Sequence, residues 1–102
     1  MSVTLFIDTS KTHAAKVAIE RNGKRFEETS QSKVTKSQAV LPLIEKLLRE
    51  HKLQLGDIHE IVVAEGPGSF TGLRVGATIA NALGDMLDIP VNGKKALAIP
   101  KY

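Results

Sequence analysis

The stretch "IVVAEGPGSFTGLRVG", residues 61–76, joins an apolar run to a segment that contains four glycines. A nearly continuous apolar run of this kind is typical of a strand that is covered on both faces of a parallel sheet. The chain that follows, residues 71–88, is apolar on most sides and predicts a largely buried helix capped by Ser69 or Thr71. The stretch therefore predicts a strand, a turn and a helix of an α/β domain.

The glycine spacing does not match the known phosphate-binding loops. A Walker A loop requires G-x-x-x-x-G-K, and the dinucleotide fingerprint requires G-x-G-x-x-G. Counting from Gly66 or Gly68 places Thr71 or Leu73 where the later glycine is needed. Two interpretations stay open. Either an anion binds at the start of the helix beside Arg74, or the glycines serve turn geometry and close packing.

Small residues recur every four positions along the predicted second helix, at Gly72, Gly76, Ala80 and Gly84. This spacing places them along one helix face. Glycine inside a helix costs about 1 kcal/mol relative to alanine, so glycines repeated there need a compensating gain. The close approach of another backbone would supply it. The stripe is predicted to pack either inside the chain, on its own sheet or first helix, or against a partner chain.

The N-terminal third of the chain predicts an antiparallel meander. Residues 2–8 are rich in β-forming side chains and end at Asp8. Residues 14–31 read as two strands joined at Asn22 and Gly23, the dipeptide most favoured in a two-residue hairpin turn.

Residues 36–52 predict an amphipathic helix, with Ser37 as its N-cap. Pro42 lacks the amide for an intrahelical bond, so the helix is expected to start late or to bend there. A last short strand is predicted at residues 89–94. The order is three antiparallel strands, then helix, strand, helix and strand. It predicts a mixed five-stranded α/β sheet with helices on its faces.

The composition restricts the class of protein. A chain of 102 residues predicts one domain, and the lack of cysteine excludes disulfides and thiolate sites. No signal segment or membrane-length apolar run is present, which favours a cytoplasmic location without a membrane partner. The net charge of +3 comes from scattered lysines, with few aromatic residues beside them. This pattern indicates a solvated basic surface rather than a separate RNA-binding face.

Three motifs together resemble a known family. They are "IDTS" at residues 7–10, "SQAVLPLIEKLL" at residues 37–48 and "GPGSFTGLRVG" at residues 66–76. In this order they resemble the N-terminal lobe of the TsaB (YeaZ) family, bacterial subunits of the tRNA threonylcarbamoyladenosine machinery. The resemblance implies a ribonuclease-H-like or actin-like ATPase (ASKHA) lobe. Residues 1–102 would form this single lobe, without the second lobe of the family.

The chain departs from the family at Lys36, Ser37 and Gln38, where family members commonly have His-Ser-Glu. That local chemistry is therefore not carried over. The resemblance implies a non-catalytic subunit that docks through its helices on TsaD, the subunit that holds the metal and transfers the threonylcarbamoyl group. It also implies that a TsaE ATPase joins the complex, that tRNA is contacted only indirectly, and that ATP or ADP with magnesium binds only in the assembled complex.

The predicted interface combines the small-residue stripe with apolar side chains of both helices. Its partner is a TsaD-like subunit or a second copy of the chain. The predicted residues are Gly72, Leu73, Gly76, Ala80, Gly84, Leu41, Ile44 and Leu48.

A metal-dependent nuclease on the same architecture is one alternative. Its carboxylates would be Asp8 and Glu65, with Glu45 or Glu50 as the third group, around two metal ions about 4 Å apart. The competing interpretation is that Asp8 caps a turn and that Glu65 is a solvated loop residue.

A weak phosphate or nucleotide site at Asp8, Thr9 and Ser10 is the other alternative. A carboxylate followed by two hydroxyls suits a hydrated metal ion and phosphate oxygens. The same groups also form turns. The chain itself is predicted to carry no catalytic residue and no metal ligand.

Overall fold

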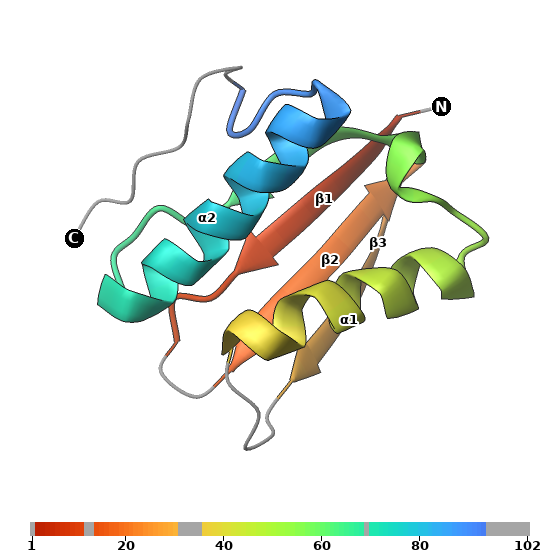
Figure 1. Ribbon diagram of the computed structural model, residues 1–102. Coiled ribbons are helices and arrows are strands. Elements are labelled where there is room, and N and C mark those ends of the chain that lie inside the picture. Colours follow the sequence, from red (N-terminus) through yellow and green to blue (C-terminus); the bar gives the residue numbers. More distant parts are fainter. Residues whose placement is uncertain (1, 12–13, 31–35, 69, 94–102) are drawn as a thin grey trace.

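The computed structural model describes residues 2–11, 14–30, 36–68 and 70–93. Within them, four strands form one mixed sheet, and two helices lie side by side on the same face of that sheet (Figure 1). The elements are β1 Val3–Asp8, β2 Ala15–Arg21, β3 Lys24–Ser30, α1 Lys36–Glu50, the 3-10 turn η1 Leu55–Asp57, β4 Ile58–Val63 and α2 Phe70–Leu87.

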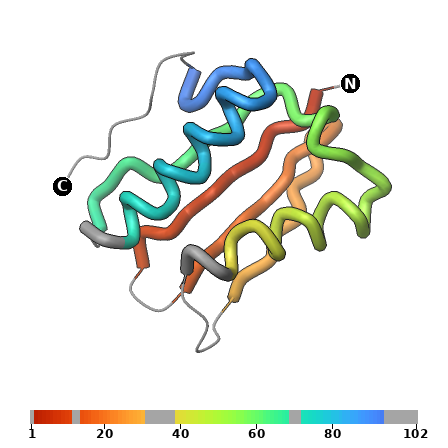
Figure 2. Tube along the Cα trace, in the orientation of Figure 1, coloured from red at the N-terminus to blue at the C-terminus, as the bar shows by residue number. Residues whose placement is uncertain are grey.

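The strand order is β3-β2-β1-β4, with antiparallel pairs among the first three strands and a parallel pair between β1 and β4. The predicted antiparallel meander is therefore confirmed, and the parallel pairing of β1 with β4 is a finding of the structure. Asn22 and Gly23 have φ angles of 55° and 77°, the left-handed conformation that a type I′ hairpin turn requires. Helix α1 carries the chain from the edge strand β3 across to β4, as the trace in Figure 2 shows.

The predicted fifth strand is reduced to one parallel bridge, between Val91 and Ile61, in the part of the chain that the structure describes. Main-chain pairing stops there because the side chain of Asn92, and not its backbone, forms the next hydrogen bonds with β4. Its Oδ1 accepts from the Val63 amide at 2.8 Å, and its Nδ2 donates to the Val63 carbonyl at 3.0 Å. Asn92 has a φ of 52°, which turns the backbone away from β4.

Both helices differ from the prediction at their first turns. Helix α1 already begins at Lys36 and runs through Pro42, so the late start is wrong and Ser37 lies within the helix. Helix α2 begins at Phe70, which places Thr71 inside it rather than at the cap, while Ser69 lies outside the described residues. Helical starts are set by the packing of the whole amphipathic face, which overrides single cap residues.

The core lies between the sheet and the two helices. Strand β1 alternates, with Leu5 and Ile7 buried on the helix side and Phe6 on the opposite side. Helix α1 contributes Ile44 and α2 contributes Leu73, both fully buried. No helix in the described ranges has both the length and the apolar character needed to cross a bilayer.

The opposite face of the sheet has no described helix over it (Figure 1). The apolar run of β4 predicted a strand covered on both faces. Only the side of Ile61 and Val63 is covered by described elements, whereas Val62 lies on the other side, beside Phe6. The prediction is therefore correct for one face.

Candidate functional site

Asp8 and Ser10 form a turn at the carboxyl end of β1. One carboxylate oxygen of Asp8, Oδ1, accepts hydrogen bonds from the Ser10 amide at 2.9 Å and from the Ser10 hydroxyl at 2.5 Å. A carboxylate that binds the backbone two residues ahead is a common turn-forming arrangement. The structure thus brings together the Asp8 and Ser10 of the predicted phosphate site, and Oδ1 of Asp8 is engaged by Ser10 within the turn.

Thr9 has a different role from its two neighbours. Its side chain is only 1% exposed, and its hydroxyl donates to the Gly72 carbonyl while accepting from the Gly76 amide at 3.0 Å. Both partners lie on α2. The Thr9 hydroxyl therefore ties the end of β1 to the helix from inside the core and does not face a site for phosphate.

The first half of the glycine segment packs against this turn. A Cβ atom at Gly68 would stand 2.7 Å from the Cβ of Ser10 and 3.0 Å from its carbonyl oxygen, closer than side chains are found. Gly68 is therefore required because the loop lies directly on Ser10. The loop also contains a cis peptide bond between Gly66 and Pro67.

The second half of the segment packs inside the chain. A Cβ atom at Gly76 would lie 2.5 Å from the Thr9 hydroxyl oxygen and 3.2 Å from a methyl of Val63. A Cβ atom at Gly84 would lie 2.5 Å from a methyl of Val91. Of the two interpretations of the stripe, packing on the chain's own sheet is the one confirmed. The bare face lets α2 come close to β1 and β4.

This packing corrects most of the predicted interface. The residues below are buried by the chain itself, so a partner cannot touch them while the fold is intact. The physical reason is that both helices turn these small and apolar faces toward the sheet, where they form the core. The residues concerned are Gly72, Leu73, Gly76, Ala80, Gly84, Ile44 and Leu48.

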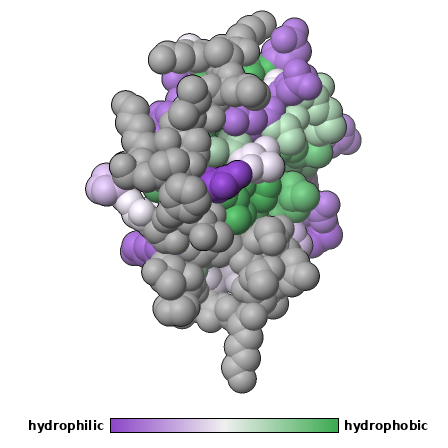
Figure 3. Space-filling model, turned by 60° about the vertical axis from the view of Figure 1, so that its left-hand side comes forward, coloured by the Kyte–Doolittle hydropathy of each residue, from purple (hydrophilic) through white to green (hydrophobic). Residues whose placement is uncertain are grey.

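Leu41 is the one predicted interface residue that the structure leaves at the surface, with 46% of it exposed. Met86 on α2, which the sequence did not single out, is 63% exposed. Single exposed apolar side chains are common on protein surfaces, and these two are accessible to a partner as the fold stands. Figure 3 shows the molecule turned by 60° from the view of Figure 1. On that side, hydrophobic residues lie next to hydrophilic ones at the surface.

The carboxylates of the nuclease alternative do not all converge, although the parallel pairing of β1 with β4 brings Asp8 and Glu65 to the same edge of the sheet. Asp8 lies at the end of β1 and Glu65 just after β4, whereas Glu45 and Glu50 are exposed on α1. Helix α1 packs over β2 and β3, away from β4. No group of three or more potential metal ligands forms within the described residues. The described residues therefore do not form the predicted two-metal nuclease site.

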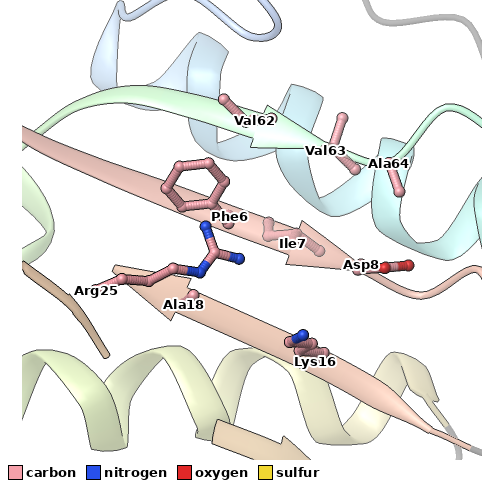
Figure 4. Close-up of a pocket in the computed structure, with 9 residues that line it drawn as sticks. All are labelled: Phe6, Ile7, Asp8, Lys16, Ala18, Arg25, Val62, Val63 and Ala64. Atoms are coloured by element: carbon pink, nitrogen blue, oxygen red, sulfur yellow. The ribbon is translucent and has the colours of Figure 1, made fainter. Parts of the chain in front are cut away.

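A hollow of about 200 Å³ lies on the uncovered face of the sheet (Figure 4). Phe6, Ala18 and Val62 supply apolar lining, and Lys16 and Arg25 supply charge. The Arg25 guanidinium stacks 4.3 Å from the centre of the Phe6 ring.

The two cations of this hollow are already engaged. Lys16 and Arg25 both pair with Glu27, at 3.2 Å and 3.0 Å. The hydrogen bonds from Arg25 and Lys16 hold the pKa of Glu27 below its usual value. The hollow is therefore not an anion site. Sequence reasoning missed it because its lining comes from four strands that become neighbours only in the folded sheet.

Asp8 is expected to make stability depend on pH. Burial raises the pKa of this carboxyl, but the Ser10 hydrogen bonds, with Lys11 and Lys16 nearby, outweigh that effect and hold the pKa below its usual value. A lowered folded-state pKa stabilises the fold above the unfolded-state pKa, near 4, and this contribution is lost as pH falls through the folded-state value. Urea unfolding should therefore show Asp8→Asn less stable than wild type at pH 7, with the gap closing below about pH 4. A gap that is constant with pH would contradict this assignment.

Comparison with known proteins places most of the chain in one protein family. The family described as TsaD, tRNA N6-adenosine threonylcarbamoyltransferase, matches residues 29–98. The tRNA threonylcarbamoyladenosine biosynthesis protein TsaB of Buchnera aphidicola is 34% identical over 97 residues, which cover 95% of this chain and 46% of that protein. The protein of the same name from Haemophilus influenzae is 38% identical over 85% of this chain and 36% of its own length.

A solved structure agrees with these sequence matches. YeaZ from Pseudomonas aeruginosa superposes with a TM-score of 0.81 at 32% identity, over 89% of this chain and 42% of that one. The chain thus spans less than half the length of these relatives.

Proposed function

Because the chain is a TsaB (YeaZ)-type member of the TsaD family, we propose that it is a non-catalytic subunit of tRNA threonylcarbamoyladenosine biosynthesis that supports a TsaD-like transferase in the cytoplasm. The observation that carries the proposal is the match to TsaB proteins over nearly the whole chain, together with the YeaZ-like fold.

The outer surfaces of α1 and α2 are the docking face in this proposal. Both helices cover one side of the sheet, and Leu41 and Met86 project from them into solvent. The buried stripe then has an indirect role, since it seats α2 on the sheet in the position from which Met86 points outward. A TsaD-like subunit is the proposed partner, a second copy of the chain would compete for the same face, and a TsaE-like ATPase would join the complex.

Nucleotide binding belongs to the assembled complex in this proposal. The described Asp8–Ser10 turn bonds to itself, so ATP or ADP with magnesium would need groups from a partner. The test of the proposed function is co-purification with a TsaD-like subunit, followed by an assay for threonylcarbamoyl transfer to tRNA. A chain that neither binds that subunit nor stimulates transfer would refute the proposal.

The docking face gives a prediction about single substitutions. Leu41→Glu and Met86→Glu are each expected to weaken association with the TsaD-like subunit by about tenfold or more, because each places a charge where an apolar anchor is buried on binding. Titration calorimetry measures the affinity. Both variants should unfold at the wild-type urea concentration, since neither side chain belongs to the core. Glu20→Gln, which is exposed on β2 and lies outside the docking face, is the control. Unchanged affinity in both variants would place the docking face elsewhere.

A further inference from the structure

Four cations lie at the end of the molecule where the β2–β3 hairpin meets the last turn of α1. Arg21 ends β2 and Lys24 begins β3, so the two flank the hairpin turn. Arg49 lies in the last turn of α1, and Lys52 follows two residues after the helix. We call Arg21, Lys24, Arg49 and Lys52 the basic corner.

Two contacts fix α1 above β3 and so bring the corner together. The Lys46 ammonium lies 3.3 Å from the Glu28 carboxylate, and the ring of His51 lies 4.0 Å from the ring of Phe26. Alternate residues of a strand point to the same face, so Lys24 shares the face of Phe26 and Glu28. The helix end therefore lies above the hairpin end of β3, and the cations of both elements are neighbours.

Local stability does not account for these cations. Arg21 and Lys24 are direct cross-strand partners, and like charges in this position are destabilising. Lys52 has a φ of 58°, at the position after a helix where glycine is preferred. The negative end of the helix dipole favours Arg49 and Lys52, but it does not explain the paired charges of the hairpin.

The cations of the corner are also not neutralised by the fold. Ion pairs among the described residues engage Lys16, Arg25 and Lys46, and none of them includes a member of the basic corner. The nearest acids in sequence are Glu20 and Glu50, which are both exposed, and Glu27, whose carboxylate already pairs with Lys16 and Arg25.

We propose that the basic corner binds the phosphate backbone of RNA. The proposal rests on the proposed function, which makes a tRNA the RNA concerned, and it goes beyond the expectation of indirect contact. RNA fits the corner better than an acidic protein does, because lysine is depleted in protein interfaces whereas Lys and Arg both neutralise nucleic-acid phosphates. The exposed anchors, Leu41 and Met86, lie outside the corner. Phosphate binding requires cations alone.

The test compares two double variants that remove the same charge. Lys24→Gln with Lys52→Gln removes two cations of the corner, and Lys16→Gln with Lys46→Gln removes two cations that are held in ion pairs elsewhere. Fluorescence anisotropy with a labelled tRNA transcript measures affinity over a series of salt concentrations. The corner variant should bind roughly tenfold more weakly at 0.1 M salt, with a salt slope lower by about 1.5, whereas the control should change less than about twofold.

Lys52→Gly separates binding from stability. Glycine relieves the left-handed conformation, so the midpoint of thermal unfolding should stay the same or rise by a few degrees while RNA affinity falls. Equal losses in both double variants, or no loss in either, would overturn the proposal. RNA affinity that is unchanged while association with the TsaD-like subunit is lost would overturn it in favour of a protein partner.

Different experimental results would contradict the proposed function and the RNA-binding corner. Association with the TsaD-like subunit is measured on the same variants by co-purification, and it should be retained by the corner variant. Corner-dependent RNA binding by a chain that does not associate with that subunit would contradict the proposed function alone. Association without any RNA binding, by the chain or by its complex, would contradict the RNA-binding corner alone.

Discussion

Gly76→Leu is expected to unfold the chain rather than to detach it from a partner. The first added carbon would already stand 2.5 Å from the Thr9 hydroxyl oxygen and 3.2 Å from a methyl of Val63. Overpacked cores lose about 1–3 kcal/mol or more, and leucine adds three further carbons to a site with no room for the first. We expect a loss of at least about 3 kcal/mol, a large part of the stability of a small domain. Urea unfolding followed by circular dichroism measures it.

Ala82→Leu is the matched control, because Ala82 is exposed on the same helix. It introduces leucine at an exposed position of α2, where the side chain meets solvent and not the core. It should therefore change the free energy of unfolding by less than about 0.5 kcal/mol. A folded Gly76→Leu protein with the wild-type urea midpoint and no affinity for the TsaD-like subunit would restore Gly76 to the partner interface.

Thr9→Val should be the second large effect. Valine keeps the shape of threonine but removes the hydroxyl that the Gly72 carbonyl and the Gly76 amide share. It also places a methyl group against both polar atoms in a site that is 1% exposed. A buried polar group left without its partner costs about 1–3 kcal/mol. The urea midpoint should fall while the slope of the transition stays unchanged.

Thr9→Ser tests the hydroxyl separately. Serine keeps both hydrogen bonds and loses one methyl group, so it should cost about 1 kcal/mol, less than valine does. If valine proved as stable as threonine, the Thr9 hydroxyl would have no structural role, and it would again be a candidate ligand for phosphate.

The local elements were readable from the sequence because local rules govern them. Asn22 and Gly23 accept positive φ angles at little cost, which fixes the hairpin and hence the register of β2 against β3. The apolar periodicity of residues 36–52 predicted an amphipathic helix without knowledge of its partner strands, although Leu41 of that pattern is exposed. The fifth strand was overpredicted, because the apolar pattern does not reveal that the Asn92 side chain replaces the backbone in pairing with Val63.

The candidate sites were less predictable, because they depend on which surfaces meet. The small-residue stripe predicted that another surface packs closely on α2, but it did not identify that surface. Gly72 and Gly76 bond to Thr9, which is more than sixty positions away in the sequence. The basic corner was invisible for the same reason. Its cations are scattered along the chain, and only the packing of α1 above β3 makes them neighbours.

The sequence by itself determined the type and order of β1 to β4 and of both helices, the hairpin and the family, since these follow from residue spacing and short motifs. The tertiary structure decided what the glycine segment is for. The missing side chain of Gly68 leaves room for Ser10, and that of Gly76 leaves room for the Thr9 hydroxyl. The segment therefore lets α2 pack directly on the end of β1. Glycine spacing sets how closely another surface can approach. The identity of that surface depends on the path of the whole chain, because it is the parallel pairing of β1 with β4 that brings residues 8–10 beneath the helix that follows β4.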